Sequence, residues 1–282
     1  MPRTPRIPLL CALASFAGLV LTGVLAYLVP VAQVRDAAAL RGFETLNRPR
    51  LTPFIDQVAH LADPLPYALI GFGLAGVALL RRRPRIAVAI VGLLVLTGLT
   101  SQTLKPLLAA PRDEWLGSGS IAAASWPSGH ATAAMTLALC AILAVPARAR
   151  PTAAVIGALF SVAVSYAILA LGWHFPSDVL GGFLVAATWT LLAVAGLVAV
   201  EQRRPSVARG EGRLRPADAL VPVVVGAAAV TVAGVLLLLA QPRGVARFVL
   251  DHAAFVAGAA GIGAAAFVLA SVLVLARGVR SA

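Results

Sequence analysis

Long apolar stretches alternate with short polar segments along most of this 282-residue chain. A helix rises about 1.5 Å per residue, so most stretches can cross the roughly 30 Å apolar layer of a bilayer, with 65–80 marginal. We predict eight spanning helices, at about 7–33, 65–80, 86–104, 128–146, 152–172, 178–200, 217–240 and 253–276. The pattern therefore indicates an all-α fold, a polytopic membrane helix bundle.

One polar segment stands out as a linker. Residues 201–216 are basic and contain prolines and glycines. They separate six predicted spans from the last two, which we expect to carry no buried charge. We predict a six-span core at 1–200 with its chemistry between 105 and 178, a cytoplasmic linker at 201–216, and a C-terminal transmembrane hairpin at 217–282.

The composition supports a membrane protein. Hydrophobic residues make up 60% of the chain and charged residues 12%, against about 45–50% and 25% in soluble domains. Cys11 and Cys140 both lie in apolar stretches, without the C-x-x-C spacing of a metal site. We therefore expect no disulfide framework, no metal and no cofactor.

The net charge of +12 predicts orientation better than it predicts a nucleic-acid partner. With the N-terminus inside, the whole excess of basic over acidic residues falls in the segments facing the cytoplasm. This asymmetry is the positive-inside pattern of membrane proteins. We predict a multi-pass protein of the cell (inner or plasma) membrane, with both termini cytoplasmic and no nucleic-acid partner.

Three polar clusters interrupt this apolar background, and the topology places all three at the outer surface. They are 105–112, which runs from Lys105 to Arg112, then 125–130 and 172–178. Lys105 is the only lysine in the chain. An ammonium group is a compact point charge with rotatable donors, so a lone lysine at this rim suggests an anion site.

Each cluster also has a purely structural interpretation. Lys105 and Arg112 could extend to the membrane interface, and Ser128 could cap a helix. Ser177 and Asp178 could stabilise the start of the following helix. These interpretations explain the clusters singly, but not why all three lie on one face.

Together the first two clusters suit a phosphate. Ser128, Gly129 and His130 open a predicted helix, whose first N–H groups point toward an anion. Glycine allows the anion to approach closely. Lys105 and Arg112 can neutralise phosphate oxygens, the guanidinium with two parallel hydrogen bonds.

The second and third clusters supply two histidines. His174 and Asp178 are four residues apart, so the carboxylate can reach one ring nitrogen and leave the other free to attack. His130, on the neighbouring helix, can then protonate the leaving oxygen. The first outer loop, 34–64, contains further basic residues and His60, but nothing in it is diagnostic.

These clusters resemble the three-part signature of the type 2 phosphatidic acid phosphatase family, which also includes the vanadium haloperoxidases. The first element is lysine, six residues, then Arg-Pro; Lys105 and Arg112 match it, and Asp113 stands in place of the proline. The second, Pro-Ser-Gly-His, is matched in full at 127–130. The resemblance covers about 86–200.

The third element of the signature is Ser-Arg, five residues, His, three residues, Asp. His174 and Asp178 match it, whereas Ala167 and Ile168 occupy the Ser-Arg positions. In the family that arginine clamps the phosphate, and the loss of one such donor typically costs about 2.7–4 kcal/mol at the transition state. Arg48 or Arg50 in the first outer loop could substitute for it.

The resemblance implies a membrane phosphoric ester hydrolase that works without metal. His174 would be the nucleophile that forms a phosphohistidine, His130 the acid and then the base, and Asp178 the group that orients His174. The implied phosphate-binding residues are Lys105, Arg112, Ser128 and Gly129. The implied substrate is a lipid phosphate or diphosphate in the bilayer, such as polyprenyl diphosphate or phosphatidic acid.

Two alternatives remain at this stage. A transporter or flippase could use the same basic rim, but it would bury charges near mid-membrane, where the predicted spans carry none. A catalytically weak or inactive family member could act as a lipid-binding or assembly subunit, which the residue at 168 leaves open.

Overall fold

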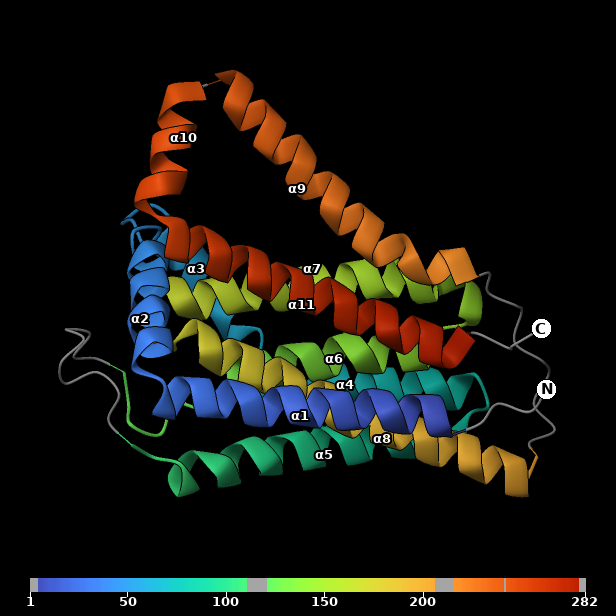
Figure 1. The fold of residues 1–282 in the computed structure, drawn as a ribbon. Coiled ribbons are helices and arrows are strands. Elements are labelled where there is room, and N and C mark those ends of the chain that lie inside the picture. The colour runs from blue at the N-terminus through green and yellow to red at the C-terminus, as the bar shows by residue number, and fades with distance from the viewer. Residues whose placement is uncertain (1–4, 111–120, 206–215, 241, 279–282) are drawn as a thin grey trace.

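The computed structural model describes residues 5–110, 121–205, 216–240 and 242–278, and every regular element in these ranges is helical (Figure 1). The all-α prediction is therefore confirmed. The elements are α1 (Arg6–Leu28), α2 (Pro30–Glu44), α3 (Thr52–His60), α4 (Pro64–Leu80), α5 (Pro84–Leu107), α6 (Gly129–Ala144), η1 (Ala147–Ala149), α7 (Arg150–Ala170), α8 (Pro176–Arg203), η2 (Pro216–Leu220), α9 (Val221–Ala240), α10 (Pro242–Asp251) and α11 (Ala253–Gly278).

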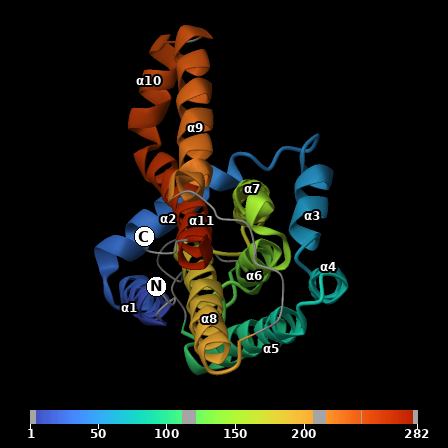
Figure 2. The same cartoon turned by 90° about the vertical axis from the view of Figure 1, so that its right-hand side faces the viewer.

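Helices α6 and α8 form the centre of the bundle. α8 packs against α1, α5, α6 and α11, and α6 packs against α7 (Figure 2). Nearly every residue of α6 after His130 is buried. The two helices α6 and α7 approach closely at Gly157, where an added Cβ would lie 2.8 Å from the Cβ of Ala138. Small residues at such contacts are typical of membrane helix packing.

Prolines mark where several helices begin, and one of them corrects the first predicted span. A proline in the first turn loses no helical hydrogen bond, because the N–H there has no partner. α1 ends at Leu28, not at 33, since Val29 is extended before Pro30 and a new helix starts at that proline.

Residues 34–64, predicted as the first outer loop, are more ordered than a loop. They contain most of α2 and all of α3, which pack against the ends of α7 and α11. The ring of Phe43 lies 5.2 Å from that of Tyr166 and 4.8 Å from that of Phe255. α2 runs across the end of the bundle in Figure 1, roughly perpendicular to α1.

Length and composition identify a multi-pass membrane protein. Five described helices, α1, α5, α7 with η1, α8 and α11, are long and apolar enough to cross a membrane. A sixth span results if α3 and α4, which meet at a 53° bend, count as one. α6 and the first part of α9 are apolar but shorter. The eight predicted spans thus correspond to helices, of which five or six meet the length criterion.

The C-terminal part divides into two portions. α11 lies in the bundle, and its Ile262, Ala266 and Ala270 join the main apolar core. α9 runs away from the bundle and α10 returns toward α2 (Figure 1). The core–linker–hairpin division stays a prediction, and most of the linker lies outside the described residues.

Candidate active site

The elements that carry the three polar clusters meet at one end of the bundle. α5 ends just after Lys105, α6 begins at Gly129, and the turn before α8 holds His174 (Figure 1). α2 and α3 lie at this same end. Arg112, the second basic residue of the first cluster, lies outside the described residues.

The start of α6 is held in place by hydrogen bonds around Ser128. The Ser128 hydroxyl oxygen accepts from the Ala131 N–H at 3.3 Å, and the Ser128 carbonyl accepts from the N–H and hydroxyl of Thr132. The Ser128 N–H donates to the Asp178 carbonyl at 2.9 Å. The capping interpretation is confirmed, and because the cap uses the oxygen, the Ser128 O–H remains able to donate to an anion.

Lys105 reaches the first turn of α6 from the end of α5. A Cβ added at Gly129 would lie 3.6 Å from the Lys105 Nζ and 3.6 Å from the Gln102 Nε2. The ammonium and the amide thus lie beside the N–H groups that open α6. Gln102 is a donor that the sequence interpretation missed, although it lies one helical turn before Lys105.

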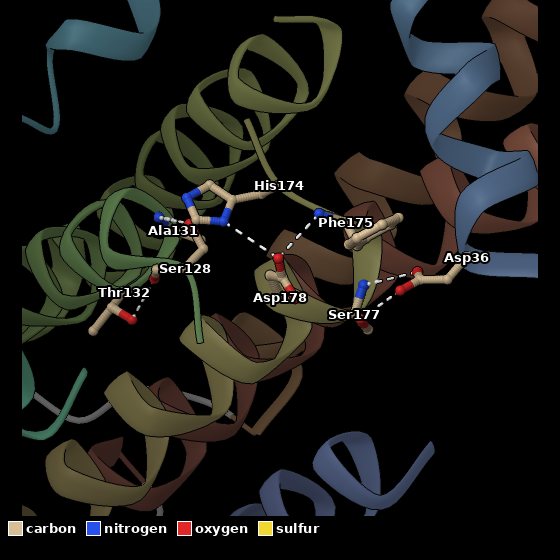
Figure 3. A network of polar contacts seen from close by, with 8 residues as sticks. All are labelled: Asp36, Ser128, Ala131, Thr132, His174, Phe175, Ser177 and Asp178. Atoms are coloured by element: carbon tan, nitrogen blue, oxygen red, sulfur yellow. Dashed lines mark hydrogen bonds and ion pairs between the residues drawn. The ribbon is translucent and has the colours of Figure 1, made fainter. Parts of the chain in front are cut away.

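His174 and Asp178 form a buried pair at the start of α8, seen in Figure 3. The His174 Nδ1 lies 3.3 Å from the Asp178 Oδ2, which also accepts from the Phe175 N–H at 3.1 Å. The Asp178 side chain is fully buried, and that of His174 is 8% exposed. A carboxylate only accepts, so Nδ1 carries the proton and Nε2 keeps the lone pair that a nucleophile requires.

His130 lies next to this pair. Its ring centroid is 5.5 Å from that of Trp173, the residue before His174. His174, Lys105 and Asp63 all lie close enough to His130 to interact with it electrostatically. The structure therefore brings together five of the predicted site residues that it describes, His130, His174, Lys105, Gly129 and Ser128, with Asp178 behind His174.

The helix α2 supports the turn before α8 from outside. The Asp36 carboxylate accepts from the N–H of Ser177 at 3.0 Å and also from its hydroxyl (Figure 3). Gly172 has a φ of +70°, and a Cβ there would lie 2.9 Å from the Glu44 Oε1. The positive φ favours glycine at this position, whereas the Glu44 side chain could move. Neither acidic residue was a sequence-based candidate.

Asp63 is a further residue that the sequence interpretation missed. Its Oδ1 lies 3.0 Å from the His130 Nε2, and its Oδ2 lies 2.8 Å from the His60 Nδ1. His130 is 67 positions away along the chain. No local spacing links them, so only the fold could reveal this contact.

Ala167 and Ile168, which stand where the family signature has Ser-Arg, are packed inside the bundle. Ile168 is fully buried and belongs to the main apolar core, and Ala167 is 5% exposed. Arg48 and Arg50, the suggested substitutes, lie in the exposed turn between α2 and α3. Within the described part of the chain, neither forms a recorded hydrogen bond with a site residue.

Comparisons with known proteins agree with this arrangement. A solved structure, the "first transmembrane PAP2 type phosphatidylglycerolphosphate phosphatase from Bacillus subtilis", shares the fold with a TM-score of 0.50 and 22% identity. The alignment covers 71% of this chain and 99% of that one. A search of curated proteins found no match. Residues 85–201 match the PAP2 superfamily. This segment contains all the predicted site residues, so the similarity to the PAP2 superfamily covers the whole candidate site.

Proposed function

We propose that this protein is a membrane lipid phosphatase that hydrolyses a phosphate or diphosphate ester through a phosphohistidine on His174. One observation supports the proposal: Lys105 at the end of α5 lies beside the start of α6, where His130 packs against Trp173, the residue before His174. The match of residues 85–201 to the PAP2 superfamily supports phosphoric ester hydrolysis in general. The roles of individual residues are our inference.

The first step transfers the phosphoryl group to the protein. The His174 Nε2 lone pair forms a bond to phosphorus while the bond from phosphorus to the leaving oxygen breaks. Protonated His130 donates its proton to that oxygen, so the product is a neutral alcohol or the shorter phosphate. Asp178 stabilises the positive charge that develops on His174.

The second step returns the protein to its starting state. Neutral His130 accepts a proton from water as the water oxygen attacks the phosphorus. The nitrogen–phosphorus bond breaks, inorganic phosphate leaves, and His130 is protonated again. Lys105, the Gly129 N–H and the Ser128 hydroxyl are placed to bind the phosphoryl oxygens in both steps, and Arg112 is proposed to join them.

We infer that the site faces the outer side of the cell membrane. The opposite end of the bundle carries most of the described arginines. Among them, the Arg81 guanidinium donates a hydrogen bond to the Ala144 carbonyl, and Arg85 forms an ion pair with Glu201 at 2.9 Å. A basic end of this kind is typical of the cytoplasmic side. A lipid could keep its tail in the bilayer while its head group enters from the interface.

Purified protein in detergent tests this proposal. We expect phosphate release from at least one lipid in a panel of phosphatidic acid, phosphatidylglycerolphosphate and polyprenyl diphosphate, with inhibition by vanadate. Substrate labelled with ³²P should transfer label to the protein as an acid-labile, alkali-stable adduct. His174→Ala should abolish both release and label, whereas His252→Ala, in the exposed turn after α10, should change neither. Undiminished release by His174→Ala would contradict the proposal.

A catalytically inactive lipid-binding protein is the second candidate, and Ile168 favours it. Because a buried isoleucine occupies this position, the arginine of the family signature is absent from the phosphate site. That candidate predicts saturable binding of the same lipid phosphates without phosphate release or protein labelling. The labelling experiment therefore separates the two.

A further inference from the structure

A carboxylate outside the family signature bridges two histidines at the edge of the site. Asp63 lies in the bend between α3 and α4, at the end of the bundle where α6 begins. Its two oxygens contact different rings: Oδ1 lies 3.0 Å from the His130 Nε2, and Oδ2 lies 2.8 Å from the His60 Nδ1. The result is a hydrogen-bonded chain from His60 through Asp63 to His130.

This contact fixes the tautomer of His130. An ionised carboxylate can only accept hydrogen bonds, so the His130 Nε2 must carry a proton. The proton that His130 gains and loses during turnover is then on Nδ1. Neutral His130 presents a lone pair on Nδ1 and can act as a base, and the imidazolium presents an N–H there and can act as an acid.

Side-chain exposure increases along the hydrogen-bonded residues from His130 to His60. The side chains of His130, Asp63 and His60 are 26%, 35% and 50% exposed. The indole of Trp173 lies between the two imidazoles, with ring centroids 5.5 Å from His130 and 5.8 Å from His60. Asp56 also approaches His60, with 3.4 Å between its Oδ2 and the His60 Nε2. These hydrogen bonds thus connect His130 to the solvent-exposed surface of α3.

We propose that Asp63 is a positioning residue that orients and charges His130, and that His60 holds Asp63 from the outer surface. This inference rests on the proposed function, in which His130 is the acid and base. Asp63 has the same relation to His130 that Asp178 has to His174, but through the opposite ring nitrogen. His174, Lys105 and Asp56 are the other titratable groups that face these three residues.

Asp63→Asn is the main test, because the amide keeps the size of the side chain and removes its charge. We expect kcat to fall about ten- to a hundredfold, a fraction of what a general acid contributes, with KM changed less than about twofold. The alkaline limb of the kcat profile should move to lower pH, because protonated His130 loses its counter-charge. Asp63→Glu should restore part of the profile.

Two matched variants separate this role from general electrostatics. Asp56→Asn removes a carboxylate of α3 that contacts His60 but has no recorded contact with His130, and should leave kcat and its pH profile unchanged. His60→Gln leaves the Asp63 carboxylate in place, so kcat should fall less than about fivefold. A profile that does not move in Asp63→Asn, or that moves equally in Asp56→Asn, would overturn the inference.

A measurement independent of turnover keeps this inference separate from the proposed function. In ¹⁵N-histidine-labelled protein, we expect His130 as the Nε2–H tautomer and His174 as the Nδ1–H tautomer, with resonances identified through His→Gln variants. Asp63→Asn should change the tautomer populations of His130 and His60, its two ring partners, and leave that of His174 unchanged. An Nδ1–H tautomer of His130 in the wild type would overturn the inference, even if the protein hydrolyses lipid phosphates. Failure of the whole substrate panel would instead contradict the proposed function.

Discussion

The site contains two imidazole–carboxylate pairs that are built in different ways. The buried pair, His174 and Asp178, is four residues apart, and its side chains are 8% and 0% exposed. The exposed pair, His130 and Asp63, is 67 residues apart, with side chains 26% and 35% exposed. The buried pair is shielded from solvent and held by its own helix start. The exposed pair depends on α4 and α6 staying in contact, and solvent weakens its electrostatics.

This difference suits the two proposed roles. A nucleophile needs one fixed tautomer and a constant field through both steps, which burial provides. An acid that becomes a base must exchange a proton in each turnover, and partial exposure keeps it near water. We therefore expect changes at the buried pair to affect turnover more than changes at the exposed pair.

Asp178→Asn should have the largest effect of the variants that test this comparison. The amide can still accept from the Phe175 N–H, so the turn is preserved, but it no longer fixes or charges His174. Loss of an orienting carboxylate lowers turnover on the order of 10⁴-fold in a comparable triad. Lipid phosphate hydrolysis by purified protein measures it.

The control for this prediction is Asp63→Asn, the equivalent change in the exposed pair. We expect it to retain at least tenfold more activity than Asp178→Asn. Equal losses in the two variants would show that burial does not distinguish the pairs.

The buried pair was predictable from sequence and the exposed pair was not, for a physical reason. His174 and Asp178 lie within one turn of a helix start, so their spacing alone places the carboxylate near the ring. Ser128, Gly129 and Lys105 were predictable in the same way, because each lies at the end of an apolar stretch. Asp63 meets His130 only because α4 packs against α6, and no periodicity encodes that contact.

The fold shows the same limit. Apolar stretches predicted the bundle helices, because the bilayer requires about twenty apolar residues for each span. They did not predict α2, α3 or α10, which are short and cross or flank the ends of the bundle. Asp36 and Glu44 on α2 were therefore missed as supports of the site. The sequence could not decide whether 217–282 forms a separate hairpin, since the apolar residues by which α11 joins the core, such as Ile262 and Ala266, could face lipid or protein.

Gly182→Ala tests how both pairs depend on the contact between α6 and α8. A Cβ at Gly182 would lie 2.7 Å from the Ser128 carbonyl and 2.9 Å from the Thr132 N–H nitrogen, both of them backbone atoms. Overpacking against backbone should destabilise the protein by about 1–3 kcal/mol and displace the start of α6. Thermal unfolding in detergent, with turnover in parallel, measures both effects.

Gly196→Ala is the matched control on the same helix. Nothing lies within 4 Å of a Cβ at Gly196, so we expect unchanged activity and unchanged or slightly higher stability. If the Gly182→Ala protein has a lower kcat but an unchanged melting temperature, the displacement is local to the site. A Gly182→Ala protein with wild-type stability and turnover would refute the close contact itself.

Asp36→Asn should have the smallest effect, and it tests whether the buried pair depends on α2. Asp36 accepts from the N–H and hydroxyl of Ser177, next to Asp178 at the positive start of α8. Asparagine retains one acceptor but loses the charge, so we expect a loss of about 1 kcal/mol in stability and a two- to fivefold loss in kcat. Arg35→Gln, a charge change on the exposed face of the same helix, should do neither. If Asp36→Asn lowers kcat as much as Asp178→Asn does, the buried pair is held by α2 rather than by its own helix. In that case both pairs depend on tertiary contacts, and burial alone is what distinguishes them.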